Sequence, residues 1–123
     1  MANPKTIFEK IIDDEIPSEK IYEDDLAIVI KDINPQAPTH VLIIPKTNEI
    51  PKLSEATEDH QTILGHLLLV AGKISRQLGV DEAFRLIINN GAAAGQTVFH
   101  LDLHILANKS FDESSIGDDL GHK

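Results

Sequence analysis

The segment from Thr97 to Leu106 reads TVFHLDLHIL and alternates between two chemical classes. Its odd positions from 99 to 105 are apolar, and positions 100, 102 and 104 are ionisable. A period of two is typical of a strand with one face in the core. Antiparallel sheets commonly bury one face and leave the other polar. The segment therefore predicts an antiparallel sheet with three ionisable side chains on one face, spaced about 7 Å apart.

The rest of the chain predicts two helices and four further strands. A helix is expected at residues 5–14, and a longer one at 58–78, where apolar side chains recur with a 3.6-residue rhythm. Thr57 suits its N-cap and Gly79 its C-terminal end. Strands are expected at residues 21–23, 26–31, 40–44 and 84–88. This order predicts an α+β fold with a five-stranded antiparallel sheet, one N-terminal helix and one long helix.

Size and composition limit the classes of function. The 123 residues suit a single domain, 1–123, and we expect residues 1–4 and about 111–123 to be mobile. The absence of cysteine excludes disulfides and thiolate metal sites. No stretch resembles a signal peptide or a membrane span, which favours a soluble, cytoplasmic protein without membrane contact. The net charge of −9 disfavours nucleic acid as a partner.

Three interpretations compete for the ionisable face of the last strand. It is a solvated strand face, a metal site or a row of side chains facing a bound phosphate. Ligands at i, i+2 and i+4 spread too widely for one small ion, which disfavours metal. The preceding loop, NNGAAAGQT at residues 89–97, is made of small residues whose backbone N–H groups can approach an oxyanion. This loop favours the phosphate, although no Gly-Lys-Ser/Thr follows as in a P-loop.

Four blocks of the chain resemble the histidine-triad family, in its branch of small nucleotide-binding proteins. They span residue 5 to about residue 106 and read TIFEKIIDDEIPSEKIYEDD, KDINPQAPTHVLIIPK, ILGHLLLVAGK and INNGAAAGQTVFHLDLHIL. The family signature is His-φ-His-φ-His-φ-φ, in which φ is apolar. The sequence fits it except at the centre, where Asp102 replaces histidine. The sequence Ala107-Asn108-Lys109 also replaces the family's Gly-Gly-Arg, and the C-terminal tail differs from the family's.

The resemblance implies a homodimer with one sheet continuing across both subunits and a purine nucleoside monophosphate in each. It implies neither a cofactor nor a metal. Asp32 would accept hydrogen bonds from both ribose hydroxyls, although a turn cap before Pro35 also explains this residue. His40 would support the histidine row. The purine base would contact Ile7, Phe8 and Ile33, although ordinary core packing also explains these three residues. The ribose and phosphate would contact Asn89, Gly95, Gln96, Thr97 and Val98.

Asp102 changes the chemistry that the resemblance implies. In active relatives the central histidine attacks the α-phosphorus, and water then releases the nucleotide from the histidine. His104 would hydrogen-bond the phosphate or the leaving group. A carboxylate about 4 Å from the phosphate would instead repel it by roughly 4 kcal/mol at an effective dielectric of about 20. Protonation of the flanking His100 and His104 would offset part of this repulsion, because a carboxylate favours the charged imidazoles.

The leading hypothesis is a protein that binds a purine nucleoside monophosphate or phosphoramidate. Its ancestry would be that of a nucleoside phosphoramidase, a hydrolase, with turnover weakened or lost at Asp102. One alternative is a non-catalytic dimeric interaction module that has kept the fold. The other is a metal-dependent hydrolase that uses His100, Asp102 and His104 as ligands.

Overall fold

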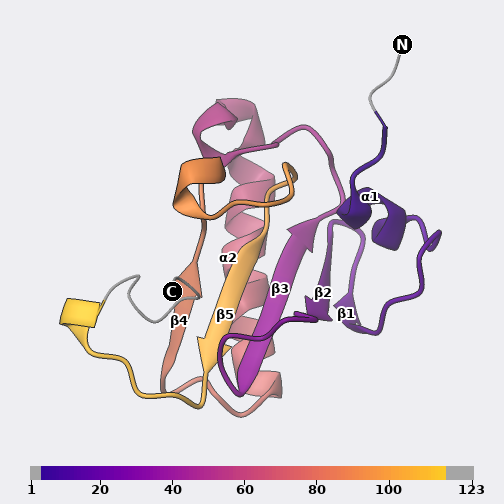
Figure 1. Cartoon of the computed structure of the whole chain (residues 1–123). Helices are drawn as coiled ribbons and strands as arrows, with labels where there is room; N and C mark the ends of the chain where they lie inside the picture. The colour runs from indigo at the N-terminus through magenta and orange to yellow at the C-terminus, as the bar shows by residue number, and fades with distance from the viewer. Residues whose placement is uncertain (1–3, 116–123) are drawn as a thin grey trace.

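The computed structural model describes residues 4–115 and contains a five-stranded antiparallel sheet with two α-helices (Figure 1). The strand order across the sheet is β1-β2-β3-β5-β4, so the last strand lies between the third and the fourth. The strands are β1 (Lys20–Glu23), β2 (Ala27–Lys31), β3 (Thr39–Pro45), β4 (Phe84–Ile87) and β5 (Leu103–Ala107). The helices are α1 (Ile7–Ile12) and α2 (Gln61–Gln77), with 3₁₀ turns η1 (Leu53–Glu55), η2 (Glu58–His60), η3 (Ala92–Ala94) and η4 (Glu113–Ser115). The predicted α+β fold and its element order are confirmed.

Local capping explains where the helices begin and end. Thr6 caps α1 in a reciprocal arrangement, in which its hydroxyl accepts from the Glu9 N–H and the Glu9 carboxylate accepts from the Thr6 N–H. Thr57 starts the second helical segment as predicted, but the first turn is η2, and the α-helix proper begins at Gln61. Gly79 follows the end of α2 with a φ of +73°, a conformation that glycine adopts without strain.

The sheet separates two apolar clusters. The α2 helix covers one face, where it packs on alternate residues of the central strands that include Val41, Ile43 and Ile105. The shorter α1 covers part of the opposite face, where Phe8 and Ile11 pack on side chains such as Leu42. Because α1 has only six residues, it leaves the β3–β5 part of this second face without a helical cover (Figure 1). His40 of β3 and His104 of β5 lie on that uncovered part, beside Leu42.

The final strand is shorter than predicted. Regular pairing of β5 with β3 and β4 begins at Leu103, and residues 97–102 follow an irregular path. Within that path the Leu101 N–H donates to the Ile50 carbonyl, a partner outside the sheet. The predicted alternation of the two strand faces therefore holds only from Asp102 onward, and His100 does not follow it.

Both chain ends were expected to be mobile. Phe111 lies under the Arg85 guanidinium at 4.5 Å from the ring centroid, and an Arg85 N–H donates to the Asp112 carbonyl at 2.7 Å. Residues 1–3 and 116–123 lie outside the described part. Within residues 4–115, no helix has the length and apolar character needed to cross a bilayer.

Candidate functional site

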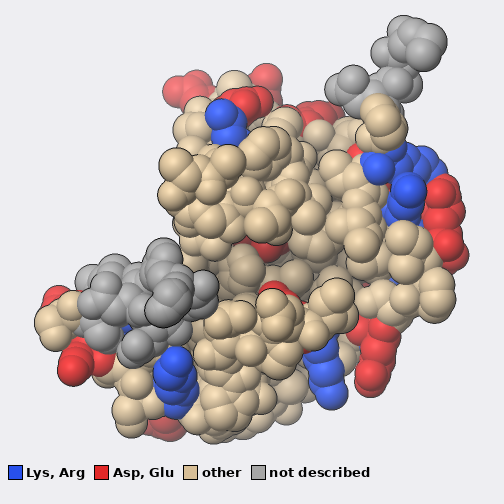
Figure 2. All heavy atoms as spheres, viewed as in Figure 1, with Lys and Arg blue, Asp and Glu red and all other residues tan. Residues whose placement is uncertain are grey.

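A hollow of about 80 Å³ opens on the uncovered sheet face, between the loop after β2 and the loop before β5. Figure 2 shows this depression at the centre of the face, with acidic atoms inside it. Apart from Leu42, its lining consists of residues that the sequence singled out. The lining residues are Phe8, Asp32, Leu42, Asn89, Gly95, Gln96, Thr97, Val98, Asp102 and His104. The structure thus brings together segments that are far apart in the chain.

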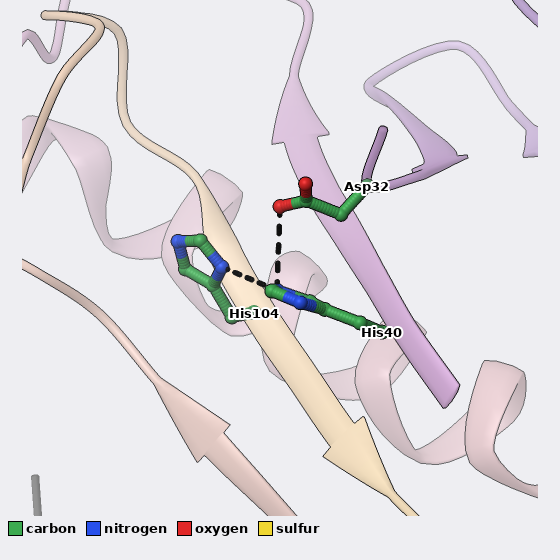
Figure 3. Close-up of side chains that lie close together, drawn as sticks. All are labelled: Asp32, His40 and His104. Carbon is green, nitrogen blue, oxygen red and sulfur yellow. Dashed lines mark hydrogen bonds and ion pairs between the residues drawn. The ribbon is translucent and has the colours of Figure 1, made fainter. Parts of the chain in front are cut away.

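Strand pairing places the two histidines of the site next to each other. His104 on β5 lies opposite Leu42 on β3, and His40 lies opposite Leu106. The two imidazoles are therefore diagonal neighbours on one face, with His40 Nε2 2.9 Å from His104 Nδ1 (Figure 3). Asp32, directly after β2, directs its Oδ2 toward His40 Nε2 at 3.4 Å. Its Oδ1 accepts from the Asn34 N–H at 2.7 Å, so the turn-cap role is present as well.

Hydrogen-bond directions fix the protons in this group. The backbone N–H of Gln36 donates to His40 Nδ1 at 3.0 Å, so this nitrogen carries a lone pair. Burial lowers the pKa of His40, and His104 lowers it further, whereas the Asp32 and Asp102 carboxylates raise it. A neutral His40 has its proton on Nε2 and donates to His104 Nδ1. His104 then carries its proton on Nε2, which lies 3.1 Å from Asp102 Oδ2.

A chain of hydrogen bonds therefore runs from the Gln36 N–H through His40 to His104 Nδ1, and Asp102 lies next to the other ring nitrogen of His104. Each ring nitrogen of His104 thus has a neighbour, His40 on one side and Asp102 on the other. The Asp102 carboxylate is at the end of this row, and its side chain is 13% exposed. Gln36 could not be identified from the sequence, because a backbone N–H in a loop does not depend on residue type. Leu42 was detectable, since it lies two residues after His40 on a predicted strand.

The donor atoms of Asp32, His40 and His104 all lie within 4.8 Å of one another, as a metal site requires. The tautomer of His40 disfavours metal binding by this cluster. A metal at His40 Nε2 needs a lone pair there, yet Gln36 keeps the lone pair of the neutral ring on Nδ1. Binding an ion would require this backbone hydrogen bond to break. The metal set considered from the sequence differs from this cluster in two members, His100 and Asp102.

The expectation that His100 faces the same pocket as Asp102 and His104 is wrong. His100 is 2% exposed, and its Nε2 donates to the Pro45 carbonyl at 2.8 Å. Its ring meets the Phe8 ring edge-on at 6.0 Å, and Nδ1 is buried without a hydrogen-bond partner among the described residues. The physical reason is the irregular backbone before Leu103, which breaks the alternation between residues 100 and 102. His100 thus contacts Pro45 at the end of β3 and Phe8 of α1, and it does not line the hollow.

The loop before β5 uses several of its own polar groups internally. The N–H groups of Gly95 and Gln96 donate to the carbonyls of Ala92 and Gly91, respectively. The buried Gln96 side chain accepts from the Gly91 N–H at 2.7 Å and donates to the Pro51 and Val98 carbonyls. The amides expected at an oxyanion are therefore fewer than the sequence suggested.

The donors that remain toward the hollow come from Asn89, Thr97 and Val98. Neither the Asn89 side chain nor the Thr97 and Val98 N–H groups have hydrogen-bond partners within residues 4–115. Gly95 adopts a φ of +101°, and a Cβ there would lie 3.6 Å from the Asn89 amide nitrogen. This backbone conformation is strained for any residue with a side chain. The three remaining donors are neutral groups.

Two residues expected at the base pocket lie outside the hollow. Ile7 is 46% exposed and Ile33 is 98% exposed, and neither belongs to the lining. Phe8 lines the hollow but is otherwise buried in the α1 cluster.

The comparisons with known proteins agree with this geometry. The family model described as HIT domain matches residues 13–111. The chain belongs to the HIT domain family. It is 42% identical over 120 residues to the purine nucleoside phosphoramidase of Escherichia coli, covering 97% of this chain and 96% of that protein. A maize relative named 14 kDa zinc-binding protein is 45% identical over 108 residues, covering 87% and 84%.

Solved structures of HIT proteins have the same fold. A HIT family hydrolase from Legionella pneumophila superposes with a TM-score of 0.85 at 35% identity, covering 89% of this chain and 97% of that one. The five-stranded antiparallel sheet with two helices is therefore a HIT fold, as the sequence blocks indicated.

Proposed function

We propose that this HIT protein binds a purine nucleoside monophosphate or phosphoramidate at the hollow, with weakened hydrolytic turnover. The observation that carries the proposal is the position of Asp102, at the centre of the family signature and next to His104 in the hollow. The phosphoramidase activity of the Escherichia coli relative, 42% identical, supports the reaction class. Asp102, His104 and His40 would form the altered catalytic group, and His100 would support it from the core.

The volume of the hollow indicates which part of the ligand it accommodates. About 80 Å³ is far below the roughly 300 Å³ or more that encloses a whole small ligand. The phosphate and ribose would lie inside, near Asp32, Asn89 and Thr97. Gly95, Gln96 and Val98 would complete this part of the site. The base would lie outside, where it covers the exposed side chains of Ile7 and Ile33 next to Phe8.

Weak turnover follows from the roles of the two residues that face the phosphate. A carboxylate is a poor nucleophile toward an anionic phosphate, because the charges repel at a few ångströms. His104 has His40 at one ring nitrogen and Asp102 at the other, so neither nitrogen is left for a leaving group in this arrangement. Both changes act on the chemical step and leave the ribose and base contacts intact.

A homodimer is the second part of the proposal. Leu68 and Leu69 on α2 are 56% and 75% exposed, and Leu64 lies beside Leu68 in a shallow apolar groove. The outer edge of β4 has no partner strand among residues 4–115. Exposed apolar side chains and a free strand edge are both features of surfaces that pair with another copy.

A calorimetric titration with AMP and GMP tests the binding function. We expect saturable binding with one site per chain. Asp32→Ala should weaken it, whereas Asp112→Ala, outside the hollow, should not. Complete absence of binding by AMP, GMP and adenosine 5′-phosphoramidate would favour a non-catalytic interaction module instead.

A metal-dependent hydrolase is a second candidate, favoured by the Asp32–His40–His104 cluster and by the name of the maize relative. We give it less weight because of the Gln36 hydrogen bond to His40. Equilibrium dialysis against Zn²⁺ decides the question, with His40→Gln as the control. We expect no zinc retention that depends on His40, whereas one equivalent lost in the variant would establish the metal site.

A further inference from the structure

We propose that Asp102 makes the hollow selective for nucleoside phosphoramidates over nucleoside monophosphates. The two ligand types differ in the group attached to phosphorus, which is an amine in one and a second ionised oxygen in the other. The inference rests on the proposed function, because it names which of the two ligand types the site retains. It assigns Asp102 a role in recognition, at a position where the family signature has a histidine.

The charge of the site is the first argument. Asp32 and Asp102 both line the hollow, and no Lys or Arg of residues 4–115 does so. Figure 2 shows acidic atoms within the depression and basic atoms only away from it on this face. The lowered pKa of His40 disfavours the charged form of this ring, the histidine that lies next to Asp32. A monophosphate carries close to two negative charges near neutral pH, and a phosphoramidate monoester carries about one. The site therefore penalises the monophosphate more strongly.

The hydrogen-bond capacity of Asp102 is the second argument. Its Oδ2 lies 3.1 Å from His104 Nε2, and its Oδ1 has no hydrogen-bond partner among the described residues. A carboxylate only accepts hydrogen bonds. The N–H of a phosphoramidate supplies a donor to Oδ1, whereas a terminal phosphate oxygen supplies a lone pair and a charge. The same residue thus attracts one ligand type and repels the other.

The position of His104 is the third argument. Its Nδ1 faces His40 and its Nε2 lies 3.1 Å from Asp102, so turning Nε2 toward a phosphate would move it away from the Asp102 carboxylate. The remaining donors, from Asn89, Thr97 and Val98, are neutral and serve both ligand types alike. The preference for phosphoramidates over monophosphates therefore depends on Asp102.

The test compares three adenosine ligands by calorimetry at about pH 8, where AMP is a dianion. These are AMP, its methyl ester, which has one charge and no donor, and adenosine 5′-phosphoramidate, which has one charge and an N–H. Phosphorus NMR on the same samples verifies that the phosphoramidate stays intact. We expect the phosphoramidate to bind most tightly and AMP most weakly, with a difference of roughly tenfold or more between them.

Asp102→Asn is the matched variant, since it keeps the shape and removes the charge. We expect it to strengthen AMP binding and to reduce the difference between the ligands to about threefold or less. Thermal melts of parent and variant verify that both are folded. AMP binding that equals or exceeds phosphoramidate binding in the parent would overturn the inference and leave the proposed nucleotide site standing. Equal affinities for the methyl ester and the phosphoramidate would overturn the role of the N–H. If no ligand binds either protein, the proposed function itself fails.

Discussion

The Nε2 atom of His104 lies 3.1 Å from the Oδ2 atom of Asp102. The histidine expected to assist the leaving group thus lies against the residue in the nucleophile's place. His40 lies at the other ring nitrogen of His104, at 2.9 Å. In the proposed function, Asp102 therefore weakens two catalytic roles at once, its own and that of its neighbour.

Reversion at position 102 should restore hydrolysis. Asp102→His replaces a repelling carboxylate with a neutral nucleophile and frees the His104 N–H for the leaving group. We expect release of ammonia from adenosine 5′-phosphoramidate to rise about a thousandfold, which corresponds to roughly 4 kcal/mol of removed repulsion. Phosphorus NMR measures the rate. Asp102→Asn is the control, because it removes the charge without supplying a nucleophile; a reversion no faster than this control would contradict the assignment.

Acid should destabilise the fold through Asp24. Burial raises the pKa of this carboxyl, but hydrogen bonds from Tyr22, His66 and the backbone outweigh it and lower the pKa to about 2. A depressed pKa means that the stabilisation is present above the unfolded value of about 3.8 and is lost as pH falls toward 2. Asp24→Asn should cost on the order of 2 kcal/mol at neutral pH.

Urea unfolding at pH 7 and at about pH 2.5 measures the Asp24 contribution. The parent should lose stability relative to Asp24→Asn as the pH falls through this range. Asp25→Asn is the matched control, since its side chain is exposed and the neighbouring turn bonds are made by Asp24. An equal effect of the two substitutions at pH 7 would refute the assignment.

The loop before β5 should depend on Gln96. Gln96→Leu keeps a buried side chain of similar size but leaves the Gly91 N–H and the Pro51 and Val98 carbonyls without this partner. We expect a loss of about 1–3 kcal/mol in unfolding free energy, because unpaired buried polar groups are costly. Ligand affinity should fall as well. Gln61→Leu, at an exposed position, is the control and should change neither quantity.

The fold was predictable because its signals are local and periodic. The spacing of apolar residues in α2 and the alternation at residues 101–105 report burial directly, and both patterns correspond to one covered face. The site was predictable in its membership through the sequence blocks, since Asp32, Asn89 and Thr97 do line one hollow. What failed was the extension of the alternation to His100. That residue lies on irregular backbone, and its partners are the Pro45 carbonyl and the Phe8 ring.

The protonation pattern could not be predicted from residue types. It depends on one backbone N–H, that of Gln36, which determines the tautomer of His40 and through it that of His104. The sequence argument for charged histidines flanking Asp102 assumed free rings on a common face. In the structure His104 lies between His40 and Asp102 while His100 is buried elsewhere, so the three side chains do not form a row on one face.

Substitution on α2 should separate dimer from monomer. In the proposed homodimer, Leu68 and Leu69 lose their exposure, and a charged side chain there would have to be buried without a partner. We expect the parent to elute with about twice the chain mass in light-scattering chromatography, and Leu68→Lys/Leu69→Lys to elute as a monomer. Glu19→Lys, an exposed site before β1 and outside the α2 groove, should leave the mass unchanged. A parent that is monomeric at micromolar concentration would remove the dimer from the proposal, and an unchanged dimer in the double variant would assign the interface to another surface, such as the free edge of β4.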